Sequence, residues 1–215
     1  MNTGKTIFFD MDGTLLDTEK YYHKYWILAA KECGYTMTRE MALSLRSLGR
    51  PYAPERINGW YQDDNAYHAI RDKRIEMMGQ ALSQDGITLK PYAKETLAEL
   101  KNRGHHLAIT TATGPERTEA YLQEVSLYPY FDSIVCATMV EHGKPAPDIY
   151  LYACEQLKVR PEDAYVVEDA PNGILAGHRA GCHVIMVPDL TQPDEELNKL
   201  LYRKVENLKE LLEIF

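Results

Sequence analysis

Long apolar runs are missing from this sequence of 215 residues, and their absence bears on where the protein acts. No window approaches the roughly 20 apolar residues that a membrane-spanning helix needs. The apolar run before Asp10 is also too short for the core of a signal peptide. We therefore expect a cytoplasmic protein that does not bind membranes.

Paired cysteine motifs are absent as well. The four cysteines lie far apart in the sequence, and no two of them form a C-x-x-C pair. This spacing favours reduced, mostly buried thiols over disulfides or a zinc site. The residues concerned are Cys33, Cys136, Cys154 and Cys182.

An excess of basic residues is also lacking. Lys and Arg number 24 against 32 Asp and Glu, which gives a formal net charge of −8, and no basic stripe stands out. Non-specific binding to nucleic acid depends on neutralising phosphates with such residues, so we expect no nucleic-acid partner. An acidic protein with an anionic substrate needs a metal ion and locally placed cations.

The most informative stretch for predicting fold and function is residues 7–17, Ile-Phe-Phe-Asp-Met-Asp-Gly-Thr-Leu-Leu-Asp. Its three bulky apolar residues predict a buried strand, and Asp10 and Asp12 follow at the end of that strand, before Gly13. Acids at the carboxyl end of a parallel strand face the ligand crevice of an α/β domain. An ordinary strand-to-turn transition, in which Asp and Gly are common, is the alternative.

The rest of the chain divides into a helical part and an alternating part. Helical patterns run from Asp17 to Gly34, from a cap at Thr38 to Ser44 and over residues 63–83, with a loop at 46–51. From Pro91 onward, helical and strand patterns alternate, which indicates a parallel sheet of βαβ units. We expect strands at 107–111, 133–136, 164–167 and 183–187, and helices at 91–104, 115–126, 147–157, 171–180 and 209–214.

The stretch around Asp10 resembles the first motif of the haloacid dehalogenase-like superfamily of phosphotransferases. The resemblance implies that Asp10 is a nucleophile and Asp12 a general acid/base. Dehalogenases of the family lack the second Asp, so Asp12 indicates phosphoryl transfer. The chemistry agrees, because one carboxylate can attack phosphorus while a second carboxyl group protonates the leaving oxygen and later activates water.

Two later segments resemble the second and third motifs of the family. Thr111 ends a predicted strand, and its hydroxyl, with backbone N–H groups near Ala112, is expected to cradle phosphate oxygens. Thr110 competes with it by one position, and a Thr at the end of a strand is unremarkable in isolation. Lys144 lies in Gly-Lys-Pro-Ala-Pro-Asp, with Tyr150 completing the motif, and is expected to hold the nucleophile and phosphoryl oxygens. A solvated loop lysine is the alternative.

Glu168 and Asp169 match the fourth motif, a pair of acids at the end of a strand. Two adjacent carboxylates near Asp10 would repel each other strongly unless a divalent cation neutralised them. The family pattern implies Mg²⁺, with Asp10 and Asp169 as side-chain ligands, the Asp12 backbone carbonyl as a third ligand and Glu168 supporting bound water. An acid pair favoured by a helix N-terminus is the alternative, but it does not account for the other three motifs.

The resemblance covers essentially the whole chain, with a doubly wound α/β core at 1–15 and 86–215 and a small helical cap at 16–85. It is strongest to the branch that contains β-phosphoglucomutase and small phosphomonoesterases. We therefore expect a Mg²⁺-dependent phosphatase of a small phosphorylated metabolite, such as a sugar phosphate, phosphoglycolate or a nucleotide. Arg50 in the cap loop is expected to bind the distal part of this substrate, because its planar fork suits phosphate or carboxylate; a solvated loop arginine is the alternative.

Two other functions fit the same motifs. The first is a sugar phosphomutase, but β-phosphoglucomutase-like sequences place a His five positions after the last Asp of the first motif. Here that position is Tyr22, and His23 follows about 100° further round the helix, so it should not substitute. The second is a non-catalytic sensor of phosphorylated ligands. Its expected signature is the loss of Asp10 or Asp12, and both residues are present.

Overall fold

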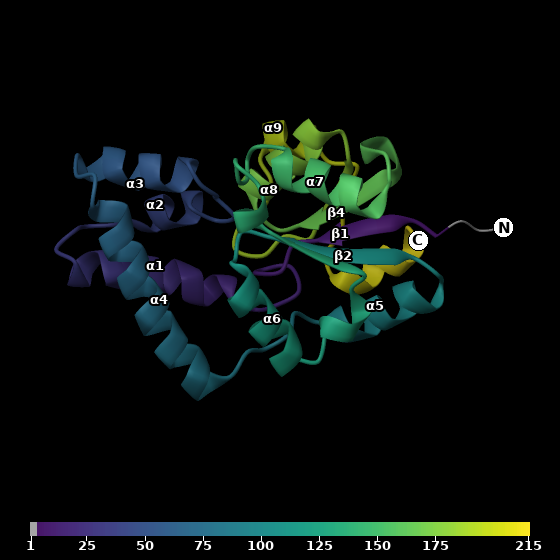
Figure 1. Ribbon diagram of the computed structural model, residues 1–215, viewed down its shortest axis with the longest axis horizontal. Helices are drawn as coiled ribbons and strands as arrows, with labels where there is room; N and C mark the ends of the chain where they lie inside the picture. Colours follow the sequence, from purple (N-terminus) through teal and green to yellow (C-terminus); the bar gives the residue numbers. More distant parts are fainter. Residues whose placement is uncertain (1–3) are drawn as a thin grey trace.

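The computed structural model describes residues 4–215 and contains a six-stranded sheet in the order β3-β2-β1-β4-β5-β6 (Figure 1). Residues 1–3 of the expected core segment 1–15 lie outside this description. All neighbouring strands are parallel, and Phe8 of the central β1 lies beside Ala108 and Val166. The predicted α/β fold with a doubly wound parallel sheet is confirmed. The strands are β1 (Thr6–Phe9), β2 (His106–Thr111), β3 (Ser133–Cys136), β4 (Ala164–Glu168), β5 (His183–Met186) and β6 (Arg203–Lys204).

Helices cover both faces of the sheet (Figure 1). One face packs against α5, α6 and η4, and the other against α7, α8 and α9. Alternate side chains of a strand point to opposite faces, so Ile7 and Phe9 join one hydrophobic cluster and Phe8 joins the other. The helices are α5 (Ala93–Asn102), α6 (Pro115–Glu124), α7 (Asp148–Leu157), α8 (Pro171–Ala180) and α9 (Glu195–Asn198), with 3₁₀ helices η1 (Tyr128–Tyr130), η2 (Ala137–Met139), η3 (Pro161–Asp163) and η4 (Leu208–Glu213).

Four further helices, called the helical unit below, lie beside the sheet (Figure 1). They share a hydrophobic cluster of their own, which includes Trp26 and Ile70. Where the chain leaves β1 and where it returns toward α5, the two segments are hydrogen-bonded, with the Asp17 N–H donating to the Thr88 carbonyl at 2.9 Å. The helices of the unit are α1 (Glu19–Glu32), α2 (Arg39–Ser44), α3 (Tyr52–Tyr61) and α4 (Ala66–Asp85).

Helix α3 was not expected from the sequence. Pro54 and Gly59 lie inside it, and both residues ordinarily disfavour a helix interior. Pro54 falls in the first turn, where its missing N–H costs no hydrogen bond. Ile57 is fully buried in the cluster of the helical unit, so tertiary packing stabilises a helix that local propensity does not favour.

Smaller differences occur at the edges of the α/β part. The helix expected from Pro91 begins at Ala93, because Tyr92 adopts a left-handed conformation with φ 65°. The final helix is a 3₁₀ helix rather than an α-helix, although Asn207 caps it by accepting a hydrogen bond from the Lys209 N–H. Helix α9 and strand β6 have four and two residues, too few for a periodic pattern to predict them.

The cysteines are all free, and three of the four are buried, with Cys33 partly exposed. This agrees with the predicted reduced thiols. Within residues 4–215, no helix combines the length and the apolar character that crossing a membrane requires.

Candidate active site

The acids that end β1 and β4 lie together. Carboxylate oxygens of Asp10, Glu168 and Asp169 lie within 4.8 Å of one another, and all three residues are buried. Two glycines leave room for them, because a Cβ at Gly173 would overlap the Glu168 carboxylate and one at Gly13 would lie 2.5 Å from Asp169 Oδ2. Gly13 also has a φ of +88°, which favours glycine. The parallel pairing of β1 with β4 thus assembles the acidic cluster expected from the sequence.

Lys144 is the cation at the centre of this cluster. Its buried ammonium donates to Asp10 Oδ1 and Glu168 Oε1, both at 2.6 Å, and to the Thr110 carbonyl at 3.0 Å. Tyr150 donates a further hydrogen bond to Glu168 Oε1 at 3.0 Å. Burial by itself lowers the pKa of a lysine, but attraction by Asp10 and Glu168 outweighs it and raises the pKa of Lys144 well above its usual value. The lysine is therefore charged and fully hydrogen-bonded rather than solvated.

The acidic cluster carries more negative charge than the protein neutralises. Burial raises the pKa of Asp10 well above its usual value, and Glu168 adds to the effect while Lys144 opposes it. Burial also raises the pKa of Asp169 to about 7, against the influence of Arg46. Asp10 Oδ2 is buried and has no hydrogen-bond partner among the described residues. A divalent cation would satisfy this oxygen and favour the ionised carboxylates, so the cluster could hold a metal.

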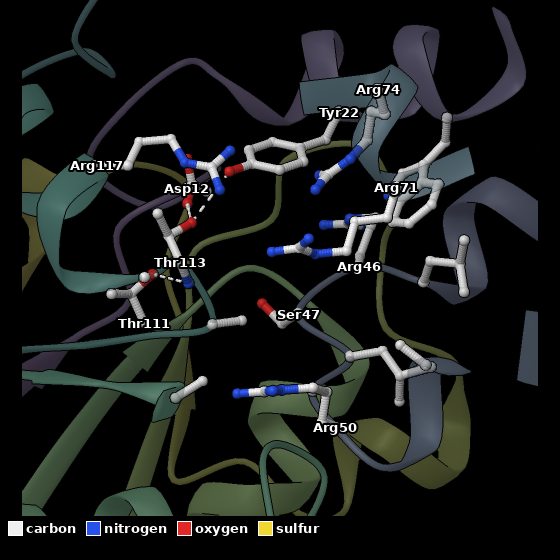
Figure 2. Close-up of a pocket in the computed structure, with 18 of the residues that line it drawn as sticks. Asp12, Tyr22, Arg46, Ser47, Arg50, Arg71, Arg74, Thr111, Thr113 and Arg117 are labelled. Carbon is white, nitrogen blue, oxygen red and sulfur yellow. Dashed lines mark hydrogen bonds between the residues drawn. The ribbon is translucent and has the colours of Figure 1, made fainter. Parts of the chain in front are cut away.

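Asp12 is held by two hydroxyl groups. Thr18 donates to its Oδ1 at 2.6 Å. Thr113 donates to its Oδ2 at 2.7 Å (Figure 2). The hydroxyl of Tyr22, from α1 in the helical unit, lies 3.0 Å from Thr113 Oγ1. These two hydrogen bonds fix the carboxyl group of Asp12 at the cavity wall. Tyr22 contacts Thr113, one of the two residues that donate them. His23 does not line the cavity, as its position on the helix predicts.

Thr111 and Ala112 line the cavity between Asp12 and the start of α6, whereas Thr110 does not. The Thr111 hydroxyl accepts a hydrogen bond from the Thr113 N–H at 3.0 Å (Figure 2). Thr110 is fully buried and contributes its carbonyl to Lys144. Of the two alternatives left by the sequence, Thr111 is the hydroxyl in position to meet a ligand.

The cavity itself has a volume of about 360 Å³ and lies between the strand ends and the helical unit. Asp10 and Asp12 line it from the sheet side, and Arg50 from the loop between α2 and α3. Figure 2 shows the guanidinium groups of several arginines directed into this space. Five arginines contribute to its wall: Arg46, Arg50, Arg71, Arg74 and Arg117.

Arg46 is a site residue that sequence reasoning did not single out. Its side chain is buried and donates to the carboxylate of Asp169 and, at 3.0 Å, to the Asp169 carbonyl. It also donates to Thr191 Oγ1 at 2.7 Å, and its Nε lies 3.6 Å from Glu19 Oε1. Arg46 thus offsets part of the charge of Asp169 and occupies one acceptor site of its Oδ2. No local pattern around Arg46 distinguishes it from any other loop arginine.

Backbone contacts hold the α2–α3 loop against the loop that carries Lys144. The Gly49 N–H donates to the Lys144 carbonyl and the Gly143 N–H to the Arg50 carbonyl, both at 2.7 Å. A Cβ at Gly49 would lie 2.6 Å from Gly143 Cα, so only glycine permits this approach. The contact thus holds Gly49 and Arg50, which both line the cavity, against the loop that carries Lys144.

Comparison with known proteins agrees with this geometry. A family model described as a haloacid dehalogenase-like hydrolase matches residues 5–181, a range that contains Asp10, Asp12, Thr111, Lys144, Glu168 and Asp169. The chain belongs to the haloacid dehalogenase-like hydrolases. It is thus an enzyme, and family members generally use a divalent metal.

Individual relatives of the family are similar over nearly the whole chain. Hexitol phosphatase A of Escherichia coli is 32% identical and covers 91% of each chain. The solved structure of a mutant of CbbY from Rhodobacter sphaeroides in complex with xylulose-(1,5)-bisphosphate is 28% identical, covers 97% of this chain and 96% of its own, and has a TM-score of 0.80. A putative β-phosphoglucomutase from Bacteroides vulgatus has a TM-score of 0.84 at 24% identity, covers 98% of this chain and 87% of its own, and supports the fold alone.

Proposed function

We propose that this phosphoric monoester hydrolase is a Mg²⁺-dependent phosphatase of a small phosphorylated metabolite. The observation that supports this most is the pairing of Asp10 with Lys144, next to Asp12 on the wall of a cavity of about 360 Å³. One carboxylate is held by an ammonium and the other by two hydroxyl groups, so the two acids have different environments. Acids in different environments suit the different roles of nucleophile and proton donor.

In the proposed reaction a carboxylate oxygen of Asp10 attacks the phosphorus atom, and the bond from phosphorus to the leaving oxygen breaks. Protonated Asp12 donates its proton to that oxygen. Asp12 then accepts a proton from water as the water attacks the aspartyl-phosphate, which releases inorganic phosphate and restores Asp10. Thr111 and Ala112 hold phosphoryl oxygens, and Lys144 offsets negative charge beside Asp10.

The residues of the acidic cluster fit Mg²⁺. Its ligands would be side-chain oxygens of Asp10 and Asp169 and the backbone carbonyl of Asp12, with Glu168 supporting bound water. The unpartnered Oδ2 of buried Asp10 supports this choice. When bound, the ion supplies positive charge that stabilises the phosphoryl group in the transition state.

The helical unit fits the role of a cap, assigned to residues 16–85. It contributes the cavity wall opposite the strand ends, including Arg50. The guanidinium of Arg50 is exposed and has no ion-pair partner within residues 4–215. In the proposed complex it binds the distal part of the substrate.

A sugar phosphomutase is the second candidate, because the fold is also that of a putative β-phosphoglucomutase. A mutase must protect its aspartyl-phosphate from water until the sugar phosphate intermediate has rebound in the reverse orientation. It therefore needs a cap whose closure is coupled to proton transfer. Here Tyr22, not a histidine, contacts Thr113, which donates a hydrogen bond to Asp12. Because burial raises the pKa of Tyr22 far above neutrality, it cannot exchange a proton there, and hydrolysis is favoured.

The test is a phosphate-release screen of the purified protein with Mg²⁺ against sugar phosphates, polyol phosphates, phosphoglycolate and nucleotides. We expect release from at least one class, and none from folded Asp10→Asn, which nearly preserves shape but removes the attacking charge. Near wild-type release by that variant would rule out the covalent mechanism. The mutase is tested by following β-glucose 1-phosphate by NMR: bisphosphate-dependent conversion to glucose 6-phosphate that outpaces phosphate release would overturn the phosphatase assignment.

A further inference from the structure

Arg74 of α4 is a buried charge without a polar partner. It is 7% exposed, its Nε is buried and unpaired, and it donates no hydrogen bond and forms no ion pair within residues 4–215. Its guanidinium carbon lies 4.8 Å from the ring centroid of Tyr22 and 4.4 Å from that of Trp26. Cation–π contacts with these two rings leave the N–H groups of the guanidinium without an acceptor among the described residues, so they are available to a ligand.

The other charges of the cavity do not neutralise Arg74. Three carboxylates line the cavity, and each is already engaged: Asp10 with Lys144, Asp12 with two threonine hydroxyls, and Glu19 beside Arg46. Five arginines line the same space in a protein whose formal net charge is −8. The lining itself, with five arginines and three carboxylates, is therefore net cationic, and such a surface attracts anions.

Arg117, on α6 of the α/β part, lies near Arg74. Figure 2 shows both guanidinium groups beside the ring of Tyr22, with Arg50 across the cavity. Arg117 is half-buried and, within the described residues, has no carboxylate at ion-pair distance. Burial lowers the pKa of Arg74, Tyr22 opposes this effect, and the positive charge of Arg117 adds to it.

A purely structural arginine in the same unit looks different. Arg56 of α3 donates to the carbonyl of Ser44 at 2.7 Å and so has a partner in the folded chain. Arg74 contacts two aromatic rings but has no hydrogen-bond acceptor for its N–H groups among the described residues. Buried charges are ordinarily paired, so the missing partner is expected to come from outside the chain.

We propose that Arg74, with Arg117, binds a second anionic group of the substrate, remote from the phosphate that is cleaved. The inference rests on the proposed phosphatase function and names the substrate class as phosphorylated metabolites with a second phosphate or a carboxylate. The edge of a guanidinium donates two parallel N–H groups, which match either oxyanion. Arg71, on the same helix, is half-exposed and paired with Asp72, and it is not required for this site.

Measuring binding to a protein that does not turn over tests this inference independently of catalysis. The full chain carrying Asp10→Asn, which should not turn over, is titrated calorimetrically with fructose 1-phosphate and fructose 1,6-bisphosphate, and with glucose 6-phosphate and 6-phosphogluconate. We expect at least tenfold tighter binding of the doubly anionic member in one pair or both. The pair that shows the preference identifies the second group as phosphate or carboxylate, and equal affinity within both pairs overturns the inference.

The assignment to Arg74 is tested in the same background. Arg74→Met should abolish the preference while changing the affinity for the singly phosphorylated member by less than threefold, and Arg74→Lys should retain part of it. Lys73→Met removes a charge from the neighbouring position of α4, outside the cavity lining, and should retain all of it. A preference that survives Arg74→Met, or an equal loss with Lys73→Met, refutes the assignment. If Arg74→Met fails to fold, an undiminished preference in Arg74→Lys refutes the bidentate contact.

The two proposals fail separately. Absence of phosphate release by the wild-type protein from every compound in the screen would contradict the phosphatase function. Equal binding of singly and doubly anionic compounds by the Asp10→Asn protein would contradict the second anion site, whatever the wild-type protein hydrolyses.

Discussion

Replacing Lys144 by methionine tests whether the acidic cluster depends on one buried cation. Methionine retains most of the apolar stem but removes the ammonium that donates to Asp10 and Glu168 at 2.6 Å and to the Thr110 carbonyl at 3.0 Å. Both carboxylates are at most 2% exposed, so water cannot replace the lost partner. The variant therefore leaves two buried carboxylates without the charge that balances them.

The expected cost follows from the burial of these groups. Removing one partner of a buried ion pair lowers the free energy of unfolding by about 3–5 kcal/mol. With a urea m-value of about 3 kcal/mol/M, the unfolding midpoint should fall by about 1–1.7 M. The matched control is Lys101→Met, which breaks a surface ion pair with Asp132 and should cost at most about 1 kcal/mol.

The decrease in the free energy of unfolding caused by Lys144→Met should also depend on pH. The pKa of Asp10 is raised in the folded protein, so its contribution to stability is fully present below the unfolded pKa and is lost as pH rises through the folded pKa. Without Lys144 this pKa rises further, because the lysine is the group that opposes burial and Glu168. The difference between wild type and variant should therefore be larger at pH 8 than at pH 5.

The assay is urea unfolding of the metal-free proteins in excess chelator, followed by circular dichroism at pH 5 and pH 8. If Lys144→Met lowers the free energy of unfolding no more than Lys101→Met does, the role of the buried ammonium is refuted. If Lys144→Met lowers the free energy of unfolding equally at both pH values, the electrostatic origin of the effect is refuted.

Three further predictions concern catalysis. Chelation should stop turnover, Mg²⁺ should restore it, and Ca²⁺ should inhibit because its larger, looser coordination misplaces nucleophile and phosphate; full activity in excess chelator would contradict the metal site. Asp12→Asn should leave the fold intact and nearly abolish steady-state phosphate release, since the leaving oxygen loses its proton donor; wild-type turnover in a folded variant would exclude that role. Arg50→Ala should raise KM by about 10- to 100-fold, the worth of one hydrogen bond to a charged group, with a smaller effect on kcat; unchanged kcat/KM would refute contact with the substrate.

The strand ends of the α/β part could be predicted because their signals are local and their geometry is general. Short apolar runs followed by acids, a hydroxyl or a lysine mark the ends of successive segments. Parallel strands bring their carboxyl ends to one edge of a sheet, so the α/β fold places Asp10, Glu168 and Asp169 at the same edge, and the pairing of β1 with β4 brings them together. Lys144, in contrast, reaches the cluster from a loop, and its place was predicted by resemblance to the family motif.

The helical unit was harder to predict. Helix α3 contains Pro54 and Gly59, and only the burial of Ile57 against neighbouring helices accounts for it. Likewise, Tyr22 meets Thr113 across the cavity although 91 residues separate them in the sequence. Such contacts depend on how the unit rests on the strand ends, and hydrophobic periodicity does not encode that orientation.

Sequence by itself thus determined the parallel sheet, the order of its elements and the acids at its strand ends, because each follows from patterns a few residues long and from the common geometry of parallel sheets. Apart from Arg50, which was expected from the sequence, only the tertiary structure decided which arginines line the cavity. Arg46 pairs with Asp169 from 123 positions away, and Arg74 is buried against two aromatic rings without a hydrogen-bond or ion-pair partner among residues 4–215. Burial and the position of a partner are properties of the packed chain, so two arginines that look alike in the sequence have different surroundings once the helical unit covers the sheet.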